Sequence, residues 1–456
     1  MNRKIIISIM LSLAVFTGTF RSQAQQQVTL DEAIDLALKN NPAVKVARNQ
    51  VSIATAKNTQ ARATLYPQAD VLSKYFFSNN LPSMYPLEGV SVPVMNNGTP
   101  TGDNIIMHPM APYPDRSRDV LTFDFNVVYP IYAGKKRVNA VASTEKLQEA
   151  YTSDLKNTEE DLRLKVKTAY YNNLLLSEVI DVYHQILDQL NKHLALAKIA
   201  YKEGVRSEFD VLNFQSKIEE FRHRLVEMEG KQVIARTALK NLLALPDTAD
   251  IMVAGTLEDQ IGRTGTPLLY LEDVRKGNYK LQSLRYLEEV LDKKKEIEAA
   301  GKLPTIFTFG NYHIYHGMDF PPFDQTWRNG FAVGVGLKIN LFDGNRTKGK
   351  VEEMNATIDR IRNYQEGLDL QLRYRYNKAI EDIQSLNAQK KAAQEHLRVA
   401  EKAYHIAEVG YENGVITNIE LNDAQLNVAK VKLSLLNIDK DLLLEYAQLQ
   451  YLSGKE

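Results

Sequence analysis

The sequence FAVGVGLKINLFDG, residues 331–344, alternates between large apolar residues and small or polar residues. Its apolar side chains are those of Phe331, Val333, Val335, Leu337, Ile339 and Leu341. The sequence LTFDFNVVYPIYAG, residues 121–134, shows a similar alternation and ends on a glycine 210 residues earlier. Because successive side chains of a β-strand point to opposite faces, both stretches predict strands with one apolar face.

The same 210-residue offset relates other parts of the chain. YKEGV at 201–205 corresponds to YENGV at 411–415, and Leu162-Arg163 corresponds to Leu372-Arg373. Several matches in one register indicate an internal duplication, with halves at roughly 28–245 and 279–453. In each half we expect a helix of about 25 residues (42–66; 279–303), two strands, one very long helix (135–202; 345–412), a tight turn and a last helix (208–245; 418–452).

We therefore divide the chain into four parts. These are a signal peptide at 1–24, a first repeat at 25–245, a linking (equatorial) segment at 246–278 and a second repeat at 279–456. The expected strands are 68–77 and 120–132 in the first repeat, and 305–315 and 331–342 in the second. The proline-rich residues 78–119 are interpreted as a surface loop between the first two strands.

The N-terminus has the order of a secretory signal. Arg3 and Lys4 precede an apolar run, and small residues precede an expected cleavage after Ala24. The chain has no cysteine, so neither disulfides nor a lipid-modified cysteine is expected in the exported protein. Its 56 basic and 56 acidic residues balance, which gives no reason to expect nucleic acid as a partner.

The predicted strands have the length of tilted membrane strands, about ten alternating residues. A half-buried sheet in a soluble protein is the alternative explanation of this pattern. Four strands are too few to close a barrel, for which about eight is the smallest number that encloses a filled interior. Either the sheet edges are covered, or several chains share one barrel.

The two long helices, 135–202 and 345–412, would each extend about 100 Å at 1.5 Å per residue. Patterns of this length are typical of coiled coils. Gly204 and Gly414 follow them where a left-handed residue ends a helix. A structural coiled-coil protein of the cell envelope, without channel activity, would also explain these helices, although it would not explain the strands.

Together these features resemble the TolC-like outer-membrane efflux protein family over about residues 28–453. The motifs that carry the resemblance are LDEAIDLALKNNP at 30–42, LFDGNR at 341–346 and the two turns at 201–205 and 411–415. The resemblance implies a mixed fold, a membrane β-barrel continued by a long α-helical coiled-coil barrel. Three chains with four strands each would share a 12-stranded barrel in the bacterial outer membrane and an α-helical tunnel through the periplasm.

The resemblance also implies partners and a function. The expected protein is a passive exit duct of a tripartite efflux pump or type I secretion system. Its partners would be two further copies of the chain, a periplasmic adaptor protein, an inner-membrane transporter and outer-membrane lipid. The helical turns would contact the adaptor through Gly204, Val205, Gly414 and Val415, and a periplasmic constriction would be lined by Asp210, Tyr411, Glu420 and Asp423.

Two details of this implied site depend on particular residues of this chain, and the first comes from comparison with the family that it resembles. Ile416 stands where some members of the family carry an arginine that ties the closed end to its neighbour, and Arg206 of the other repeat is a candidate substitute. Glu420 and Asp423 share a helix face, so three copies would form acidic rings that favour cations. Glu420 also has the spacing of a capping box with Thr417, and Asp423 could be an ordinary surface charge.

The sequence offers no catalytic motif, metal-ligand set or cofactor loop. The closest histidines, His313 and His316, would lie on opposite faces of a strand. Gly334-Val335-Gly336 lacks the third glycine of a dinucleotide-binding loop. We therefore expect no enzyme activity, no metal and no cofactor.

Overall fold

The computed structural model of the chain describes residues 26–78, 84–86, 90–96, 99–107, 110–112, 118–263, 270–316 and 326–454. These residues form two compact units, and each unit contains segments from both repeats. We call Ala54–Gln148 with Leu287–Arg360 the sheet unit, and the other described residues the helical unit. The expected signal peptide, 1–24, lies outside the described residues.

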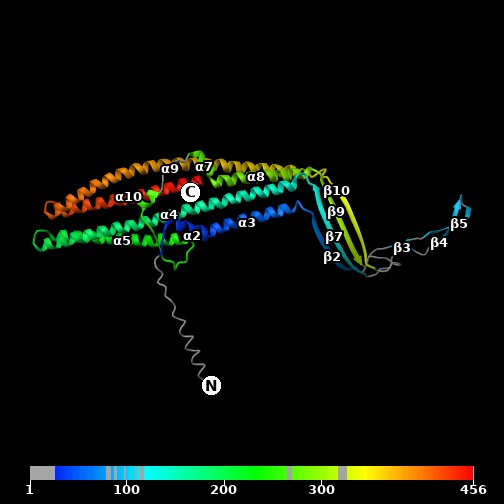
Figure 1. Ribbon diagram of the computed structural model, residues 1–456, viewed down its shortest axis with the longest axis horizontal. Helices are drawn as coiled ribbons and strands as arrows, with labels where there is room; N and C mark the ends of the chain where they lie inside the picture. The colour runs from blue at the N-terminus through cyan, green and yellow to red at the C-terminus, as the bar shows by residue number, and fades with distance from the viewer. Residues whose placement is uncertain are drawn as a thin grey trace, which may run out of the picture. The chain divides into compact units, whose positions relative to one another are not determined.

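The sheet unit contains a four-stranded antiparallel sheet (Figure 1). Its strands are β2 (Gln68–Ser78), β7 (Arg118–Tyr132), β9 (Thr305–His316) and β10 (Arg328–Lys338). Their order is β10-β9-β7-β2, so the two repeats meet where β7 pairs with β9. All four strands overlap the segments in which the sequence predicts strands.

The two faces of this sheet differ in chemistry. One face presents large apolar side chains with exposed fractions of 63–79%, those of Phe331, Val333, Val335 and Leu337. On the other face, aromatic rings of β9 lie over glycines of β10. A Cβ atom added to Gly336 would stand 2.3 Å from the Phe307 ring, and Gly334 lies under Phe309 in the same way. Glycine is needed at both positions because the rings approach the backbone so closely.

A row of polar side chains crosses three strands on this second face. Asn126 of β7 donates from Nδ2 to Asp70 Oδ2 of β2 at 3.1 Å. Asn311 of β9 donates from Nδ2 to Asn126 Oδ1 at 2.6 Å. Since a carboxylate only accepts, the Asp70 end sets the direction of both bonds. The row therefore links the two repeats through side chains as well as through the backbone ladder.

The prediction that the last strand extends to Phe342 is wrong. β10 ends at Lys338, which pairs with Thr305, the first residue of β9. Pro304 precedes Thr305 and has no N–H to donate, so β9 offers β10 no further ladder partner. The residues after Lys338 lie beyond the sheet, and the exposed fractions of Leu341 and Phe342 are 92% and 85%.

The interpretation of residues 78–119 as a single loop also needs correction. This segment contains two short antiparallel pairs, β4 (Val90–Asn96) with β5 (Thr99–Met107), and β3 (Met84–Pro86) with β6 (Met110–Pro112). Valines at alternate positions precede Asn97-Gly98, a dipeptide typical of tight hairpins. The many prolines concealed this signal because they favour loops.

Two helices of 67 residues follow the sheet strands, α4 (Lys136–Lys202) and α9 (Arg346–Glu412). Each begins after two consecutive residues with positive φ, Gly134-Lys135 in the first repeat and Gly344-Asn345 in the second. The chain therefore turns from strand to helix in the same way in both repeats. Across the described residues, no helix combines the length and the apolar composition needed to cross a membrane.

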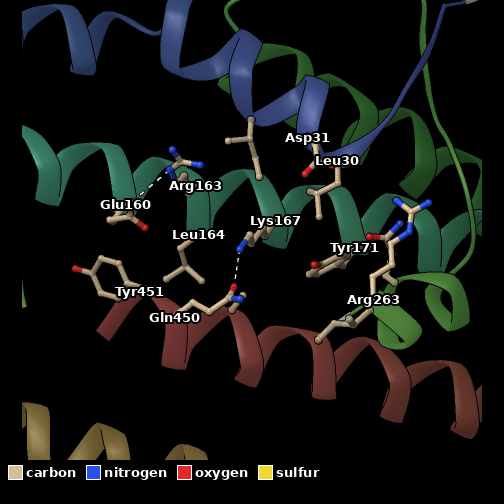
Figure 2. Close-up of a pocket in the computed structure, with 14 residues that line it drawn as sticks. Leu30, Asp31, Glu160, Arg163, Leu164, Lys167, Tyr171, Arg263, Gln450 and Tyr451 are labelled. Atoms are coloured by element: carbon tan, nitrogen blue, oxygen red, sulfur yellow. Dashed lines mark hydrogen bonds and ion pairs between the residues drawn. The ribbon is translucent and has the colours of Figure 1, made fainter. Parts of the chain in front are cut away.

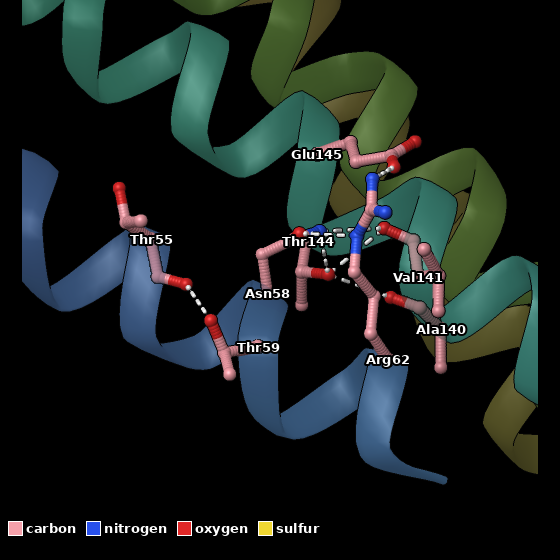
Figure 3. Close-up of polar contacts among 8 residues, drawn as sticks. All are labelled: Thr55, Asn58, Thr59, Arg62, Ala140, Val141, Thr144 and Glu145. Carbon is pink, nitrogen blue, oxygen red and sulfur yellow. Dashed lines mark hydrogen bonds and ion pairs between the residues drawn. The ribbon is translucent and has the colours of Figure 1, made fainter. Parts of the chain in front are cut away.

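A polar junction joins α3 (Pro42–Ala63) to α4 inside the sheet unit (Figure 3). Asn58 donates from Nδ2 to Thr144 Oγ1 at 3.0 Å, and its Oδ1 accepts from Arg62 Nε at 2.8 Å. Arg62 also pairs through Nη2 with Glu145 Oε1 at 2.6 Å. Because Asn58 is buried and both ends of its amide have partners, the junction carries little desolvation penalty.

The remaining elements of the described chain come from both repeats and from the linking segment at 246–278. They are β1 (Gln26–Val28), α2 (Leu30–Asn40), α5 (Glu208–Leu242), β8 (Ile251–Val253), α6 (Leu257–Arg263), α7 (Leu271–Gly277), α8 (Tyr279–Ala299), η1 (Ala300–Lys302) and α10 (Asn418–Ser453). β1 and β8 pair in parallel. The linking segment thus supplies β8, α6 and α7 to the helical unit.

Two side chains of α4 hold the linking segment within the helical unit. The hydroxyl of the fully buried Tyr170 donates to the Ala254 carbonyl at 2.7 Å and accepts from the Ala254 N–H at 3.1 Å. Glu178 accepts from the Leu257 N–H at 2.7 Å, at the first residue of α6. Burial raises the pKa of Glu178. These contacts join segments that are far apart in the sequence.

We predict that Gly336→Ala destabilises the sheet by about 1–3 kcal/mol, because the added methyl group would overlap the Phe307 ring. The double variant Gly336→Ala/Phe307→Leu should recover part of this loss, since it removes the ring. Urea unfolding of the purified protein, followed by circular dichroism, measures both effects. Gly349→Ala in α9 is the control, because, apart from the nearby backbone of α9 itself, no atom of the described residues lies within 4 Å of the added methyl group. Equal stabilities of Gly336→Ala and Gly349→Ala would contradict the close approach.

Candidate functional site

The candidate site is the pair of tight turns that end the two long helices. Gly204 and Gly414 have φ values of +71° and +78°, a conformation that favours glycine. The Val205 N–H donates to the Ala200 carbonyl at 2.9 Å, and the equivalent bond in the second repeat has the same length. The two repeats therefore form the same turn, which we call the first and second hairpin tip.

Each hairpin tip leads into a capped helix. The Ser207 side chain accepts from the Asp210 N–H, and the Asp210 carboxylate accepts from the Ser207 N–H, both at 3.3 Å. Thr417 and Glu420 make the same reciprocal pair at the start of α10. Hydrogen bonds from the backbone and side chain of Thr417 lower the pKa of Glu420. Capping therefore accounts for the carboxylates of both Asp210 and Glu420.

A contact between Arg206 and Tyr411 joins the two tips within one chain. Arg206 donates from Nη2 to the Tyr411 carbonyl at 2.8 Å, and its guanidinium lies 4.4 Å from the centre of the Tyr411 ring. The ring is only 5% exposed and stands edge-on to Phe214, at 5.9 Å between centroids. Burial raises the pKa of Tyr411. Arg206 thus combines a charged hydrogen bond with a cation–π contact.

The remaining predicted residues lie in different surroundings. Val205 and Val415 are 72% and 82% exposed, so each tip presents an apolar side chain. Asp423 is exposed on α10 outside the capping box. Ile416 packs on Gly410, where an added Cβ would meet its side chain at 2.8 Å. The structure therefore brings Tyr411 together with Arg206, whereas Asp423 stands apart on the helix surface.

Sequence reasoning missed a buried polar stripe on α10. Asn418, Asn422 and Gln425 are 2–4% exposed and lie on one helix face. Gln425 donates from Nε2 to Gln189 Oε1 of α4 at 3.1 Å. The side chain of Asn422 has no hydrogen-bond partner among the described residues, an arrangement that costs free energy. The helical spacing of these amides was the available signal, but polar side chains normally indicate a solvent-facing stripe.

A second buried polar group lies between α4 and α9. His193 Nε2 is 3.1 Å from the Tyr404 hydroxyl, which donates to Glu408 Oε1 at 3.1 Å. Since the Tyr404 proton points to the carboxylate, His193 must donate from Nε2. Burial lowers the pKa of His193. This histidine therefore disfavours protonation while the helices are packed.

A cavity of about 360 Å³ lies among α2, α4, α6 and α10 in the helical unit (Figure 2). Two of its cations are bound within the chain. Arg163 Nε pairs with Glu160 Oε1 at 3.3 Å, and Lys167 Nζ donates to Gln450 Oε1 at 2.6 Å. Because the contact between Lys167 and Gln450 joins α4 to α10, we assign this cavity a structural role.

Comparison with known proteins identifies one family. The family described as Outer membrane efflux protein matches residues 33–245 and 271–455. Outer membrane protein TolC of Vibrio cholerae serotype O1 is 21% identical over 467 residues, covering 99% of this chain and 95% of that protein. Multidrug resistance outer membrane protein MdtP of Escherichia coli K12 is 22% identical, covering 68% of this chain and 63% of its own length.

Solved structures show the same fold. The open-state MtrE outer membrane channel of Neisseria gonorrhoeae superposes with a TM-score of 0.77 at 15% identity, covering 93% of this chain and 89% of that one. The outer membrane protein VceC of Vibrio cholerae superposes with a TM-score of 0.72 at 17% identity, covering 93% of this chain and 96% of that one. The helix-rich fold with two repeats is therefore shared with outer-membrane channels.

We predict that His193 makes the protein less stable in acid. Its lowered pKa means that, as the pH falls below about 6.5, the unfolded chain binds a proton that folded His193 still rejects. The contribution of unprotonated His193 to the free energy of unfolding is therefore complete above that pH. It is lost as the pH falls towards the pKa of His193 in the folded protein. Urea unfolding at pH 7.5 and at pH 5 measures how far the free energy of unfolding falls in acid. This fall should be smaller for His193→Gln than for the wild type. His405→Gln, whose side chain is 74% exposed, is the control; equal losses in all three proteins would refute the assignment.

Proposed function

Because this chain belongs to the outer membrane efflux protein family, we propose that it is the outer-membrane exit duct of an efflux or type I secretion pump. Members of this family are channels and not enzymes, and the protein is located in the bacterial outer membrane and extends into the periplasm. The observation that carries the proposal is the sheet with one exposed apolar face, built jointly by both repeats. That face suits contact with lipid, and the polar face suits an aqueous lumen.

Three copies of the chain complete this duct. The strand order leaves β2 and β10 as the edges of the sheet, and exposed edges pair readily with other strands. Head-to-tail pairing of β10 with β2 of the next copy closes a ring when the rotation between copies allows it. Three copies with four strands each give a 12-stranded barrel, which is wide enough for a lumen.

The hairpin tips meet the periplasmic adaptor protein, which connects the duct to an inner-membrane transporter. Val205 and Val415 are apolar, exposed and held in identical turns by Gly204 and Gly414. A repeated apolar contact of this kind suits the tip of a helical partner. The transporter selects the substrate, because the duct itself conducts passively.

The periplasmic constriction lies just beyond these tips. Asp210, Glu420 and Asp423 supply its negative charge, and Asp423 is the carboxylate that no capping box engages. Tyr411 contributes by binding Arg206, since its ring is buried within the chain. Some members of the family carry, at the position of Ile416, an arginine that ties the closed end to its neighbour. In this chain Arg206 takes that role, and its contact links the two tips of one chain.

We predict that the purified protein forms trimers that conduct ions across a planar bilayer. Native mass spectrometry in detergent should give a dominant species at three times the mass of one chain. Single-channel recordings of the same sample should show discrete conductance steps. A homogeneous monomer that conducts would refute the shared barrel, and a trimer that never conducts would favour a structural protein of the envelope.

We also predict that Asp423→Asn lowers the preference of the channel for cations without preventing assembly. Removing the ring of carboxylates should move the cation-to-anion permeability ratio towards one, and adding Glu420→Gln should move it further. Reversal potentials in a salt gradient measure this ratio. Asp441→Asn, on the same helix and far from the tip in sequence, is the control and should behave like the wild type. Identical potentials for all variants would mean that these carboxylates lie outside the constriction.

A further inference from the structure

The strands β7 and β10 occupy equivalent places in the two repeats but end at different points. β7 continues to Tyr132, whereas β10 ends at Lys338, the counterpart of Val128. The last four residues of β7, 129–132, therefore correspond to residues 339–342, which follow β10 and lie in no strand. The apolar alternation of β10 nevertheless continues into 339–342. The different ends therefore reflect the partners of the two strands and not their local sequence.

Within each repeat, the ladder between the two strands starts at the same place. Gln68 pairs with Val128, and Thr305 pairs with Lys338. Gln68 and Thr305 each begin a strand directly after a proline, which has no N–H to donate, so the ladder goes no further on this side. Residues 129–132 remain in a strand because β9 pairs with them on their other side.

The other side of β10 is an edge of the sheet, and β2 forms the opposite edge (Figure 1). Among the described residues, no strand pairs with 339–342. Leu341 and Phe342 are 92% and 85% exposed, whereas their counterparts Ile131 and Tyr132 are 54% and 42% exposed. The second repeat thus lacks the neighbour that pairs with the same residues in the first, and such an open edge readily accepts another strand.

β2 is the strand equivalent to β9, because both begin after a proline and open the same ladder. Four strands are too few to bring β2 round to β10 of the same chain, so a second copy must supply it. Since all neighbouring strands of this sheet are antiparallel, β2 of the second copy would run antiparallel to β10, as β9 runs to β7. Val71, Tyr75 and Phe77 of β2 are 61–67% exposed on the apolar face, so this pairing would make that face continuous across two copies.

We propose that residues 339–342 extend β10 by pairing with β2 of a second copy, in the register that joins β7 to β9. Val128 lies opposite Phe309, the fifth residue of β9. In the same register its counterpart Lys338 lies opposite Leu72 of the second copy, the fifth residue of β2. Residues 339–342 then continue the ladder towards the first residue of β2. The proposal rests on the proposed function in one respect, namely that copies of the chain share one barrel.

This register keeps the apolar side chains of the two copies on one face of the sheet. Ile339 lies opposite Val71, and a slip of one residue would instead place polar side chains opposite apolar ones. A slip of two residues would preserve the faces and place Lys338 opposite Asp70, where the charges attract. It would break the equivalence of the two repeats, which holds in their own ladders residue by residue. The duplication therefore favours Leu72 over Asp70 as the partner of Lys338.

Disulfide cross-linking tests this register directly, because the chain has no cysteine of its own. The first test variant is Ser73→Cys/Leu337→Cys and the second is Val71→Cys/Ile339→Cys. In the proposed register each pair lies directly opposite across the join, with Cβ atoms about 4.5–5.5 Å apart. All four side chains are exposed in the single chain, so neither variant should disturb its folding. After mild oxidation of the detergent-purified protein, a non-reducing gel should show covalent dimers and trimers for both variants.

Two further variants calibrate the result. Val127→Cys/Gly310→Cys occupies the equivalent positions where β7 pairs with β9. Its disulfide should close within one chain and leave a monomer on the gel. Ser73→Cys/Val335→Cys reports the slip of two residues. In the proposed register its cysteines are diagonal neighbours about 7–8 Å apart, too far for a disulfide, so the cross-linked product should be lost.

More product from Ser73→Cys/Val335→Cys than from the first test variant would overturn the register. Cross-linking of the first test variant without the second would mean that β10 ends at Lys338 in the assembly too, which would also overturn the proposal. Native mass spectrometry reports on the proposed function independently. A trimer in which neither test variant cross-links would refute only this join, whereas a protein that stays monomeric would refute the shared barrel.

Discussion

The antiparallel pairing of β7 with β9 is the interaction on which the sheet unit depends. Each repeat supplies only two strands, and an isolated two-stranded hairpin is marginally stable in water. The register places Phe125 opposite Tyr312, so the apolar faces of the two repeats become continuous. A slip of one residue would turn the apolar side chains of one repeat to the polar face of the other. The bond between Asn126 and Asn311 favours the observed register from the polar face.

The two repeats keep the same backbone and carry different chemistry. Both long helices begin after two left-handed residues, and both end in a glycine turn followed by a capping box. Yet Arg206 of the first tip has Ile416 as its counterpart, and Lys338 of the second repeat has Val128. The turns depend on glycine and on short polar caps, which leaves the neighbouring side chains free to diverge. One duplicated scaffold thus carries, in the first repeat alone, the arginine that links the two tips.

The sequence by itself determined the features that depend on neighbouring residues. The alternation in 121–131 and 331–337 predicted strands because side chains two apart share a face whatever the partner strand is. Gly204 and Gly414 predicted the turns because few other residues adopt positive φ without strain. The spacing of Thr417 with Glu420 predicted the cap of α10 because both partners lie within one helical turn. The duplication and the family resemblance followed from the same local patterns.

Only the tertiary structure decided the features that depend on distant partners. β10 stops at Lys338 because the strand beside it begins after Pro304, which no pattern within 331–342 reveals. Tyr411 is buried because Phe214 and Arg206, from the other repeat, pack against it. The amides of α10 are buried against α4, although their polarity alone suggested a solvent-facing stripe. Burial and strand pairing are set by contacts between residues far apart in the chain, and such contacts leave no periodic signal in either segment alone.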